Sequence, residues 1–430
     1  MRTTALTLLT LAVAARAADP VVQTGSGWVM PEEGDAHKRT WMGFGPTADI
    51  WGDSLLPIVR ANLVSVATAI AAYEPVSFLV RSDDMAELKD LVANATGSNA
   101  ALAANITLVE AQLDDLWLRD TGPTFVRAAN NSATTGGIDF NFNGWGNKQK
   151  HSNDATVAKQ VTDIAGVQRV TTALVLEGGA LEVDGNGTAI ITESCVLNDN
   201  RNPGWSKEQV EQELKFLIGV QKIIWLPGIK GKDITDAHTD FYARFVAPGQ
   251  VVAALDPNPD SYDHNVTLTH LDILRNATDA SGRTLNVTVL TAPTNLRSLA
   301  NDPKNADNFA AGYINFYIAN GVVVMPQYGD DEADTAAKNT LQSLYPSRTV
   351  VALDIDGIAA GGGGIHCSTQ QEFKHDGGSA VNATGPAGGA AGASGTGGAG
   401  ASASAKPSSA LRCVPAGAVA ALVAALAMLL

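Results

Sequence analysis

Short strand-like and helix-like segments alternate along the central part of this chain, from about Met30 to Phe373. Apolar runs such as 76–80 and 106–109 have the length of strands, whereas 55–71, 84–92 and 206–217 carry apolar residues at helical spacing. Such alternation is typical of α/β proteins. About 345 residues is long for one domain, although a closed, pseudo-symmetric domain reaches that size, and no internal repeat is visible. We therefore expect a single α/β domain over residues 30–373.

Residues 1–17 have the pattern of a secretory signal peptide. Arg2 precedes an apolar run, and Ala15, Arg16 and Ala17 form a cleavage site of the small-x-small type. An N-terminal membrane anchor is the alternative, but the apolar run is short for one. We therefore exclude this segment from the fold.

The C-terminal end changes composition sharply. Residues 377–413 are rich in glycine, alanine and serine, as flexible linkers are, and residues 414–430 are apolar. Small residues, a polar spacer and an apolar tail in this order match a GPI-attachment signal, with Ser402 as a candidate attachment residue. A C-terminal membrane helix is the alternative, but the run is Ala-rich, short and interrupted by a proline and a glycine.

Eight Asn-X-Ser/Thr sequons agree with secretion, and each is expected on the surface. They begin at Asn94, Asn105, Asn130, Asn186, Asn265, Asn276, Asn286 and Asn382. We expect a secreted glycoprotein that a GPI anchor holds at the cell surface, with the lipid as its only membrane contact.

The net charge is −15, and the ends that we exclude contain basic but no acidic residues. The negative field of the remaining domain attracts cations and argues against nucleic acid or an anionic membrane as a partner. The chain has three cysteines, which is few for a secreted protein that depends on disulfides. We expect Cys195 and Cys367 to be free thiols, with Cys195 packed inside the protein.

A glycine-rich stretch precedes the second of these cysteines. The apolar run 349–355 is expected to be a buried strand, and Gly361 to Gly364 follow it shortly before Cys367. Four glycines permit positive φ and close approach by another group. A nucleophile that meets a flat substrate needs such space, although a glycine turn beside a packed free cysteine is the alternative.

Three further stretches place polar residues at expected strand ends. In 115–123, Trp117, Arg119 and Asp120 precede a Gly-Pro turn, and a structural ion pair of Arg119 with an aspartate is the alternative explanation. Glu177 is expected in an apolar strand, 175–183, just before two glycines. Asn315 is expected in the first strand of a hairpin that turns at 320–321.

The segment 236–240 contains His238 between Asp236 and Asp240. In an extended segment, His238 and Asp240 point to the same side. Zinc is disfavoured because no second histidine stands at ligand spacing, so we expect no metal. A solvated loop histidine is the alternative.

One cysteine, one histidine and several carboxylates at strand ends suggest nucleophilic chemistry by a thiolate. The nearby carboxylates suggest a substrate with a planar cation, because a guanidinium has five N–H donors that two carboxylates accept. A cysteine protease needs an oxyanion hole instead of negative charge around its nucleophile.

These stretches, in this order, resemble agmatine deiminase and the wider group that includes the Porphyromonas-type peptidylarginine deiminase. The matching motifs span residues 30–371 and are Met30-Pro-Glu, Trp117-x-Arg-Asp-x-Gly-Pro123, Asp139-Phe-x-Phe-Asn, Glu177-Gly-Gly, Asn200-Arg-Asn-Pro203, Asp236-x-His-x-Asp240, Asn315-Phe-Tyr and Gly361-Gly-Gly-x-Ile-His-Cys367-x-Thr-Gln-Gln371. The resemblance implies the pentein fold, a five-bladed, pseudo-symmetric α/β propeller with the active site at its centre.

The resemblance also implies residue roles. Cys367 is the nucleophile, His238 the general acid and base, and Asp120 and Asp240 grip the guanidinium, while Glu177 supports His238 or the substrate. The implied reaction passes through a covalent amidino-cysteine. Because the carboxylates oppose thiolate formation, we expect the cationic substrate itself to activate the thiol.

Trp117, Asn315 and Gly364 are expected to bind the substrate, with no cofactor. A homodimer is expected from the relatives, which often pair. Four positions depart from the usual agmatine deiminase pattern: Gly34 replaces an aromatic residue, Phe44 a tryptophan, Ala237 a glycine and Gly364 an asparagine. We expect Gly34 and Phe44 to alter the pocket rim.

Agmatine is the expected substrate, converted to N-carbamoylputrescine and ammonia in polyamine metabolism. The segment 144–150 has lysines but no arginine to pair with a substrate carboxylate. C-terminal arginine of peptides, or free arginine, is the alternative substrate, and a non-catalytic surface protein that keeps the fold is the alternative of another class.

Overall fold

The computed structural model describes residues 27–302, 304–305 and 308–374. These residues belong to one compact unit, which ends at Lys374. The predicted signal peptide, the linker, the GPI signal with Ser402, and the sequon at Asn382 lie outside the described residues.

The strands form five separate sheets of three or four strands each. In spatial order, the first sheet has β1 (Trp28–Val29), β5 (Thr124–Ala128), β6 (Asn131–Asp139) and β7 (Gln168–Thr171), and the second has β10 (Lys222–Leu226), β9 (Thr188–Thr192) and β8 (Leu181–Val183). The third sheet has β11 (Ala243–Ala247), β12 (Gln250–Leu255) and β13 (Asn286–Thr291), and the fourth has β14 (Tyr317–Ala319), β15 (Val322–Gln327) and β16 (Thr349–Asp354). The fifth sheet has β17 (Thr369–Phe373), β2 (His37–Phe44), β3 (Val76–Val80) and β4 (Ile106–Glu110).

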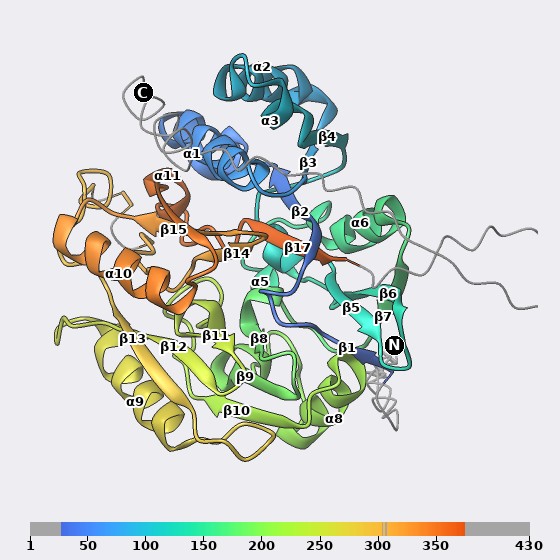
Figure 1. Cartoon of the computed structure of the whole chain (residues 1–430), viewed down its shortest axis with the longest axis vertical. Coiled ribbons are helices and arrows are strands. Elements are labelled where there is room, and N and C mark those ends of the chain that lie inside the picture. Colours follow the sequence, from blue (N-terminus) through green and yellow to red (C-terminus); the bar gives the residue numbers. More distant parts are fainter. Residues whose placement is uncertain (1–26, 303, 306–307, 375–430) are drawn as a thin grey trace, which may run out of the picture. The chain divides into compact units, whose positions relative to one another are not determined.

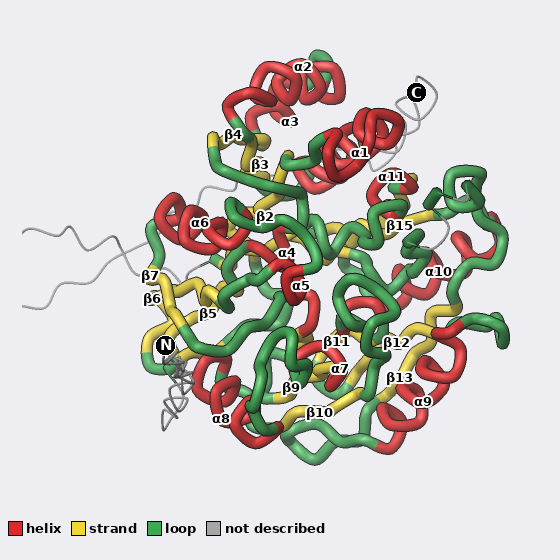
Figure 2. The backbone as a smooth tube through the Cα atoms, turned by 180° about the vertical axis from the view of Figure 1, so that it is seen from behind, coloured by secondary structure: helices red, strands yellow, loops and turns green. Residues whose placement is uncertain are grey.

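The helices connect and cover these sheets. They are α1 (Ala48–Ala71), α2 (Met85–Thr96), α3 (Ala100–Ala104), α4 (Leu118–Thr121), α5 (Gly144–Asn147), α6 (Val157–Ala165), α7 (Glu193–Val196), α8 (Lys207–Ile218), α9 (Tyr262–Asn276), α10 (Asp331–Leu344) and α11 (Asp356–Ala359). In Figure 1, α8, α9 and α10 lie on the outer side of their sheets, and the view from behind in Figure 2 shows the same arrangement.

All five sheets share one chain path. An antiparallel pair of strands is followed by a helical connection to a strand that runs parallel to the second strand of the pair. In the fifth sheet the first strand of this pattern is β17, from the C-terminal end, which pairs antiparallel with β2 so that Thr369 faces Met42. The five-bladed α/β fold is therefore confirmed, with a repeat in the backbone that the sequence does not show.

Helix α8 illustrates how a blade is held together. Ser206 and Gln209 form a capping box, with the Gln209 N–H donating to Ser206 Oγ at 3.3 Å and the Ser206 N–H donating to Gln209 Oε1 at 2.8 Å. Its apolar face contributes Val210 and Leu214 to a core cluster that also contains Ile191 of β9. Truncating such a buried leucine costs about 2–5 kcal/mol.

Helix α1 is long and apolar enough to cross a membrane, with a mean hydropathy of 1.6 over its most apolar window. Half of that window is buried inside the protein, where α1 contacts α2, α11 and β2. Such burial is typical of a core helix.

Two strand predictions were wrong in their bounds. Residues 175–180 are not a strand, since β8 begins only at Leu181, and β14 begins only at Tyr317, so Asn315 precedes it. His238 and Asp240 do not share one extended segment, because Thr239–Phe241 form a 3₁₀ turn (η4). In each case the side chains make the polar contacts of a site, which overrode strand propensity.

Candidate active site

Loops from all five sheets contribute to one site. They precede β5, β8, β11, β14 and β17, the strands that begin the repeated path in each sheet. The short helices in these loops contact one another or the neighbouring inner strand. The loops carry, in chain order, Asp120, Glu177, His238 with Asp240, Asn315 and Cys367.

Cys367 lies in the turn before β17 and is 5 % exposed. Its Sγ lies 3.2 Å from Asn315 Nδ2 and 3.6 Å from Asp240 Oδ2. Burial, together with the charges of Asp240 and Asp120, raises the pKa of the Cys367 thiol well above its ordinary value. The surroundings of Cys367 therefore favour the protonated thiol.

The four glycines before Cys367 make room mainly for the protein's own side chains. A Cβ on Gly361 would lie 2.1 Å from Trp51, one on Gly363 would lie 2.1 Å from Trp117, and one on Gly364 would lie 2.4 Å from Asn315 Oδ1. A backbone conformation that requires glycine occurs in this stretch only at Gly362, with φ of 87°. The glycines thus let the walls of the site approach the cysteine loop.

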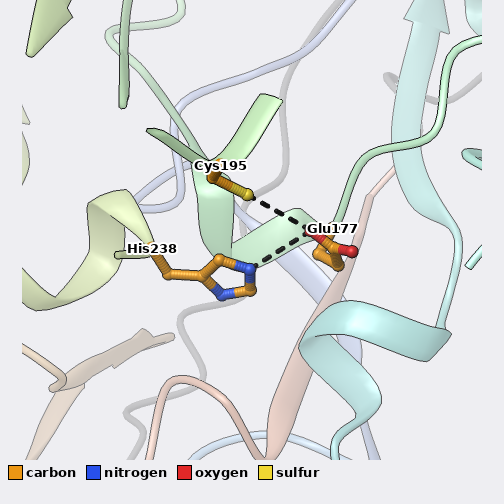
Figure 3. Close-up of side chains that lie close together, drawn as sticks. All are labelled: Glu177, Cys195 and His238. Atoms are coloured by element: carbon orange, nitrogen blue, oxygen red, sulfur yellow. Dashed lines mark hydrogen bonds and ion pairs between the residues drawn. The ribbon is translucent and has the colours of Figure 1, made fainter. Parts of the chain in front are cut away.

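His238 is fully buried and oriented by Glu177. Its Nε2 lies 3.3 Å from Glu177 Oε2, as Figure 3 shows, so the N–H on Nε2 donates to the carboxylate. Its Nδ1 has no hydrogen-bond partner within the described part of the chain and faces Asp120 Oδ1 at 3.8 Å. Burial opposes the charged imidazolium, but Asp120 and the hydrogen bond to Glu177 hold the pKa of His238 well above its usual value.

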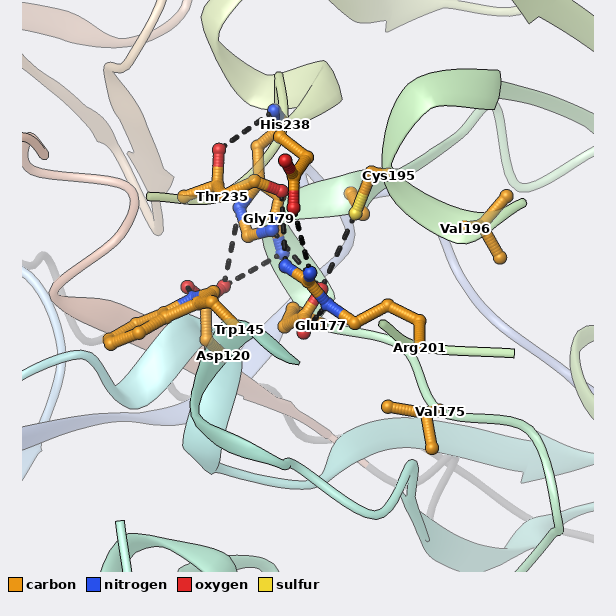
Figure 4. Close-up of polar contacts among 12 residues, drawn as sticks. Asp120, Trp145, Val175, Glu177, Gly179, Cys195, Val196, Arg201, Thr235 and His238 are labelled. Atoms are coloured by element: carbon orange, nitrogen blue, oxygen red, sulfur yellow. Dashed lines mark hydrogen bonds and ion pairs between the residues drawn. The ribbon is translucent and has the colours of Figure 1, made fainter. Parts of the chain in front are cut away.

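Glu177 is held by two further residues, which Figure 4 shows around it. Arg201 Nε donates to its Oε1 at 2.8 Å, and the Cys195 thiol donates to its Oε2 at 3.4 Å. Although burial opposes it, the hydrogen bond from His238 and the charge of Arg201 lower the pKa of Glu177. Burial raises the pKa of the Cys195 thiol to about 11, so Cys195 is a buried, neutral, free thiol, as expected.

Among the described residues, Glu177, Cys195 and His238 are the group whose ligand atoms could hold a metal ion, since these atoms lie within 4.8 Å of one another. Arg201 occupies the other oxygen of Glu177. Asp236, considered for a zinc site with His238, instead pairs with Arg201 at 2.9 Å and with Lys148 at 2.7 Å.

Asp120 is the second acid at the centre. Trp145 Nε1 donates to its Oδ2 at 3.0 Å, and the Gly179 N–H donates to its Oδ1 at 3.2 Å. Burial raises its pKa to about 6; His238 works against this shift, and the charge of Asp240 adds to it. The proposed ion pair of Arg119 with a neighbouring aspartate was wrong, because Arg119 contacts Glu33 Oε2 at 3.2 Å.

Gly179 marks the point where the catalytic groups converge. A Cβ at this position would lie 2.6 Å from His238 Nδ1, 3.0 Å from Asp120 Oδ1 and 3.1 Å from Asp240 Oδ2. The two carboxylates and the imidazole therefore surround a space that any side chain at Gly179 would occupy. The two acids give this space a negative surrounding, which suits a positively charged group.

Asp240 is fixed on one side only. Its Oδ2 lies 2.7 Å from His366 Nδ1, and its buried Oδ1 has no hydrogen-bond partner among the residues described. Burial works against the charged form, but the hydrogen bond from His366 keeps the pKa of Asp240 low. Sequence reasoning missed His366 and its second partner, Glu33, although both lie inside motifs that carry the family resemblance.

A cleft of about 670 Å³ leads to these residues. Trp117 and His238 line it, and Trp117 packs on Trp51 with ring centroids 5.9 Å apart. Asp115 accepts hydrogen bonds from both tryptophan N–H groups, at 2.8 and 3.0 Å, and so fixes this aromatic wall. Trp117 therefore forms part of a fixed aromatic wall of the cleft.

The acidic side chains at the outer part of the cleft include Asp233, Asp256 and Asp263, whereas its basic lining residue, apart from His238, is Lys304. Burial and the charges of the neighbouring aspartates raise the pKa of Asp263 to about 6, although the hydrogen bond from the Tyr242 hydroxyl opposes this shift. The cleft therefore favours positively charged ligands.

The departures at Gly34 and Phe44 do not lie at the pocket rim, contrary to expectation. Neither residue lines the cleft, and Phe44 is fully buried against Phe78. Ala237, which replaces a glycine, lies next to His238 with φ of 74°, a conformation that costs an alanine about 1–2 kcal/mol.

Comparison with known proteins identifies the family. Residues 29–372 match the model of the Porphyromonas-type peptidyl-arginine deiminase family. A Streptomyces coelicolor protein, provisionally named as an agmatine deiminase, is 40 % identical over 350 residues, which cover 80 % of this chain and 98 % of the relative. An agmatine deiminase of Medicago truncatula is 35 % identical over 376 residues, which cover 81 % and 97 % of the two chains.

The fold agrees with this result. The structure of the agmatine deiminase of Enterococcus faecalis superimposes with a TM-score of 0.74 at 32 % identity, covering 83 % of this chain and all of that one. Matches of this length and identity, together with the five-sheet architecture, lead to one conclusion: the chain belongs to the Porphyromonas-type peptidyl-arginine deiminase family, with the pentein fold.

Proposed function

We propose that this protein hydrolyses the guanidinium group of agmatine to give N-carbamoylputrescine and ammonia. The observation that carries the proposal is the set of groups around Gly179, an imidazole and two carboxylates, with the Cys367 thiol 3.6 Å from one of these carboxylates. Among the described residues, His238 Nδ1 and Asp240 Oδ1 have no hydrogen-bond partner. The named relatives in Medicago truncatula and Enterococcus faecalis support the choice of agmatine.

The guanidinium binds first. The carboxylates of Asp240 and Asp120 accept its N–H groups, and its positive charge offsets the two acids that oppose ionisation of Cys367. The thiol then loses its proton to solvent. Asn315 Nδ2, 3.2 Å from Sγ, stabilises the resulting thiolate.

The thiolate forms a bond from Sγ to the guanidinium carbon, giving a neutral tetrahedral adduct. His238, charged because its pKa is raised, donates the proton on Nδ1 to one amino group, and the C–N bond breaks to release ammonia. A positively charged amidino-cysteine remains, together with a neutral imidazole.

Water then attacks the same carbon while His238 Nδ1 accepts one of its protons. The C–S bond breaks, the ureido product leaves, and a proton from the hydroxyl group restores the Cys367 thiol. The net reaction converts a guanidinium and water into a ureido group and an ammonium ion. Glu177 keeps the imidazole proton on Nε2 throughout, so that Nδ1 is the atom that exchanges protons.

The charges of the cleft favour agmatine over arginine. Asp233, Asp256 and Asp263 suit the distant ammonium group of agmatine, and they would repel the carboxylate of free or C-terminal arginine. Ammonia release by the purified protein from agmatine, arginine and an arginine-ended peptide, beside Cys367→Ala, tests the proposal. Equal or faster turnover of the peptide would reject agmatine as the substrate.

We also propose that the protein is secreted and GPI-anchored. The signal-like N-terminus, the apolar C-terminus and the sequons support this location. Six sequon asparagines in the described part of the chain are exposed; Asn105 is half-buried and donates to the Ala71 carbonyl oxygen at 2.8 Å, so we expect it to stay unmodified. Release of the activity from intact cells by a phosphatidylinositol-specific phospholipase tests the anchor.

A further inference from the structure

A buried row of three side chains leads from the N-terminal segment to the nucleophile. Glu33 Oε2 lies 2.7 Å from His366 Nε2, His366 Nδ1 lies 2.7 Å from Asp240 Oδ2, and that oxygen lies 3.6 Å from Cys367 Sγ. Glu33, His366 and Asp240 are at most 7 % exposed. We propose that His366, locked by Glu33, is a positioning residue that holds the carboxylate of Asp240 beside the space that the substrate guanidinium enters.

The row requires two protons. Both ring nitrogens of His366 face a carboxylate oxygen at 2.7 Å, and a carboxylate only accepts hydrogen bonds. The pKa of Asp240 is low, and although burial opposes it, Arg244 and His366 hold the pKa of Glu33 well below its usual range. Each of the two short contacts therefore needs one proton between a ring nitrogen and a carboxylate oxygen, so the row holds two protons.

Glu33 is itself held in place from several elements. Its Oε1 contacts Arg244 at 2.9 Å and accepts the Ile318 N–H at 2.9 Å, and its Oε2 contacts Arg119 at 3.2 Å. Arg119 Nε also donates to the His366 carbonyl oxygen at 3.3 Å. These contacts surround His366 with fixed partners, so the ring has one orientation.

The consequence appears at Asp240. Its Oδ2 is held by His366 and would lie 3.1 Å from a Cβ at Gly179, while its buried Oδ1 has no hydrogen-bond partner among the described residues. An unpaired buried oxygen is costly, and a guanidinium N–H supplies the missing donor. His366 therefore acts through Asp240 and does not itself need to touch the substrate.

Two substitutions test the contacts of His366 Nδ1 and His366 Nε2 separately. In His366→Asn the amide nitrogen takes the place of Nδ1 and can still donate to Asp240, whereas in His366→Gln it takes the place of Nε2 and reaches Glu33 only. We expect His366→Gln to lower kcat/KM for agmatine about 100-fold, mainly through KM, and His366→Asn to lower it about 10-fold or less.

His37 provides the matched control. It is also a buried histidine, with Nδ1 3.1 Å from Glu74 and Nε2 2.7 Å from the Glu33 carbonyl oxygen, but it does not contact Asp240. His37→Gln should lower thermal stability as the His366 variants do and leave KM unchanged. Equal losses in both His366 variants, or a KM rise in His37→Gln of the same size, would overturn the proposal.

The inference rests on the proposed deiminase activity, and one readout is independent of it. Proton NMR of the full domain should show two exchange-protected, low-field imidazole N–H signals that disappear in both His366 variants. Their absence from the parent protein would overturn the proposed row. An inactive parent that shows both signals would instead reject the proposed substrate.

Discussion

Asn315 holds Cys367 at two points, because its Nδ2 lies 3.2 Å from Sγ while its Oδ1 accepts the Cys367 backbone N–H at 3.3 Å. The Asn315 amide thus orients Cys367 and donates the hydrogen bond that would stabilise a negative charge on its sulfur. Asn315→Asp keeps the acceptor but puts a carboxylate against the thiolate. We expect kcat/KM to fall about 100-fold at neutral pH, measured by ammonia release. Unchanged activity in a folded variant would contradict the assigned contact.

The Cys367 thiol should react slowly with neutral reagents. Burial and the two aspartates raise its pKa, so the alkylation rate by iodoacetamide should still be rising with pH at about pH 9. A cationic alkylating amidine should inactivate the protein faster at neutral pH, because it supplies the missing positive charge. Cys367→Ala gives the background from other thiols, and a rate plateau below neutral pH would refute substrate-assisted activation.

Gly179→Ala should abolish turnover without unfolding the protein. The added methyl group would lie 2.6 Å from His238 Nδ1 and occupy the guanidinium position. Gly312→Ala is the control, since its Cβ would be in ordinary contact, 3.5 Å from Phe241, at the wall of the same cleft. We expect kcat/KM to fall at least about 100-fold in the first variant and less than about threefold in the second.

Asp256 should recognise the far end of the substrate. Asp256→Asn keeps the acceptor for the Asn258 N–H and removes only the charge. KM for agmatine should rise about three- to fivefold, which corresponds to the free energy that an exposed ion pair contributes. The difference in KM between the variant and the parent protein should become smaller at high salt, because salt screens the ion pair. KM for butylguanidine, which lacks the ammonium group, should not change. An equal rise for both substrates would place the ammonium elsewhere.

Asp154 makes stability depend on pH. Burial, reinforced by the charges of Asp115 and Asp114, raises its pKa to about 8, and its Oδ2 has no hydrogen-bond partner among the described residues. The folded state therefore keeps a proton that the unfolded state releases near pH 4. As a result, the free energy of unfolding falls as the pH rises from about 4 to 8, by about 1.4 kcal/mol for each unit by which folding raises the pKa. Asp154→Asn should raise Tm at about pH 8 more than at about pH 5, and an equal effect at both values would reject the raised pKa.

The sequence predicts much of the outer structure because local patterns determine it. The strand 76–80 and the helix expected over 206–217 are as expected, since each depends on a few adjacent residues. The strands expected through Glu177 and Asn315 begin only after these residues, because the two side chains bond to Arg201, His238 and Cys367, which are distant in sequence. Propensity cannot foresee contacts of that range.

The same limit explains the missed site residues. Cys367, His238, Asp120, Asp240 and Glu177 could be named from motifs, and the structure brings all five together around one space. Glu33 and His366 belong to the same motifs, but their residue types alone indicate no role. Their role depends on a contact across 333 positions in the chain, which only the closure of the ring provides.

That closure sets the order in which the protein becomes functional during synthesis. Strand β17, which pairs with β2, is the last element before the end of the described domain, and the nucleophile is in the turn that leads into it. A ribosome that has made four blades has therefore exposed every acid of the site and the imidazole, but no sulfur at the nucleophile's position. On the proposed mechanism, hydrolysis must wait until Cys367 and β17 have left the exit tunnel, so a chain truncated before Cys367 should be inert toward guanidines.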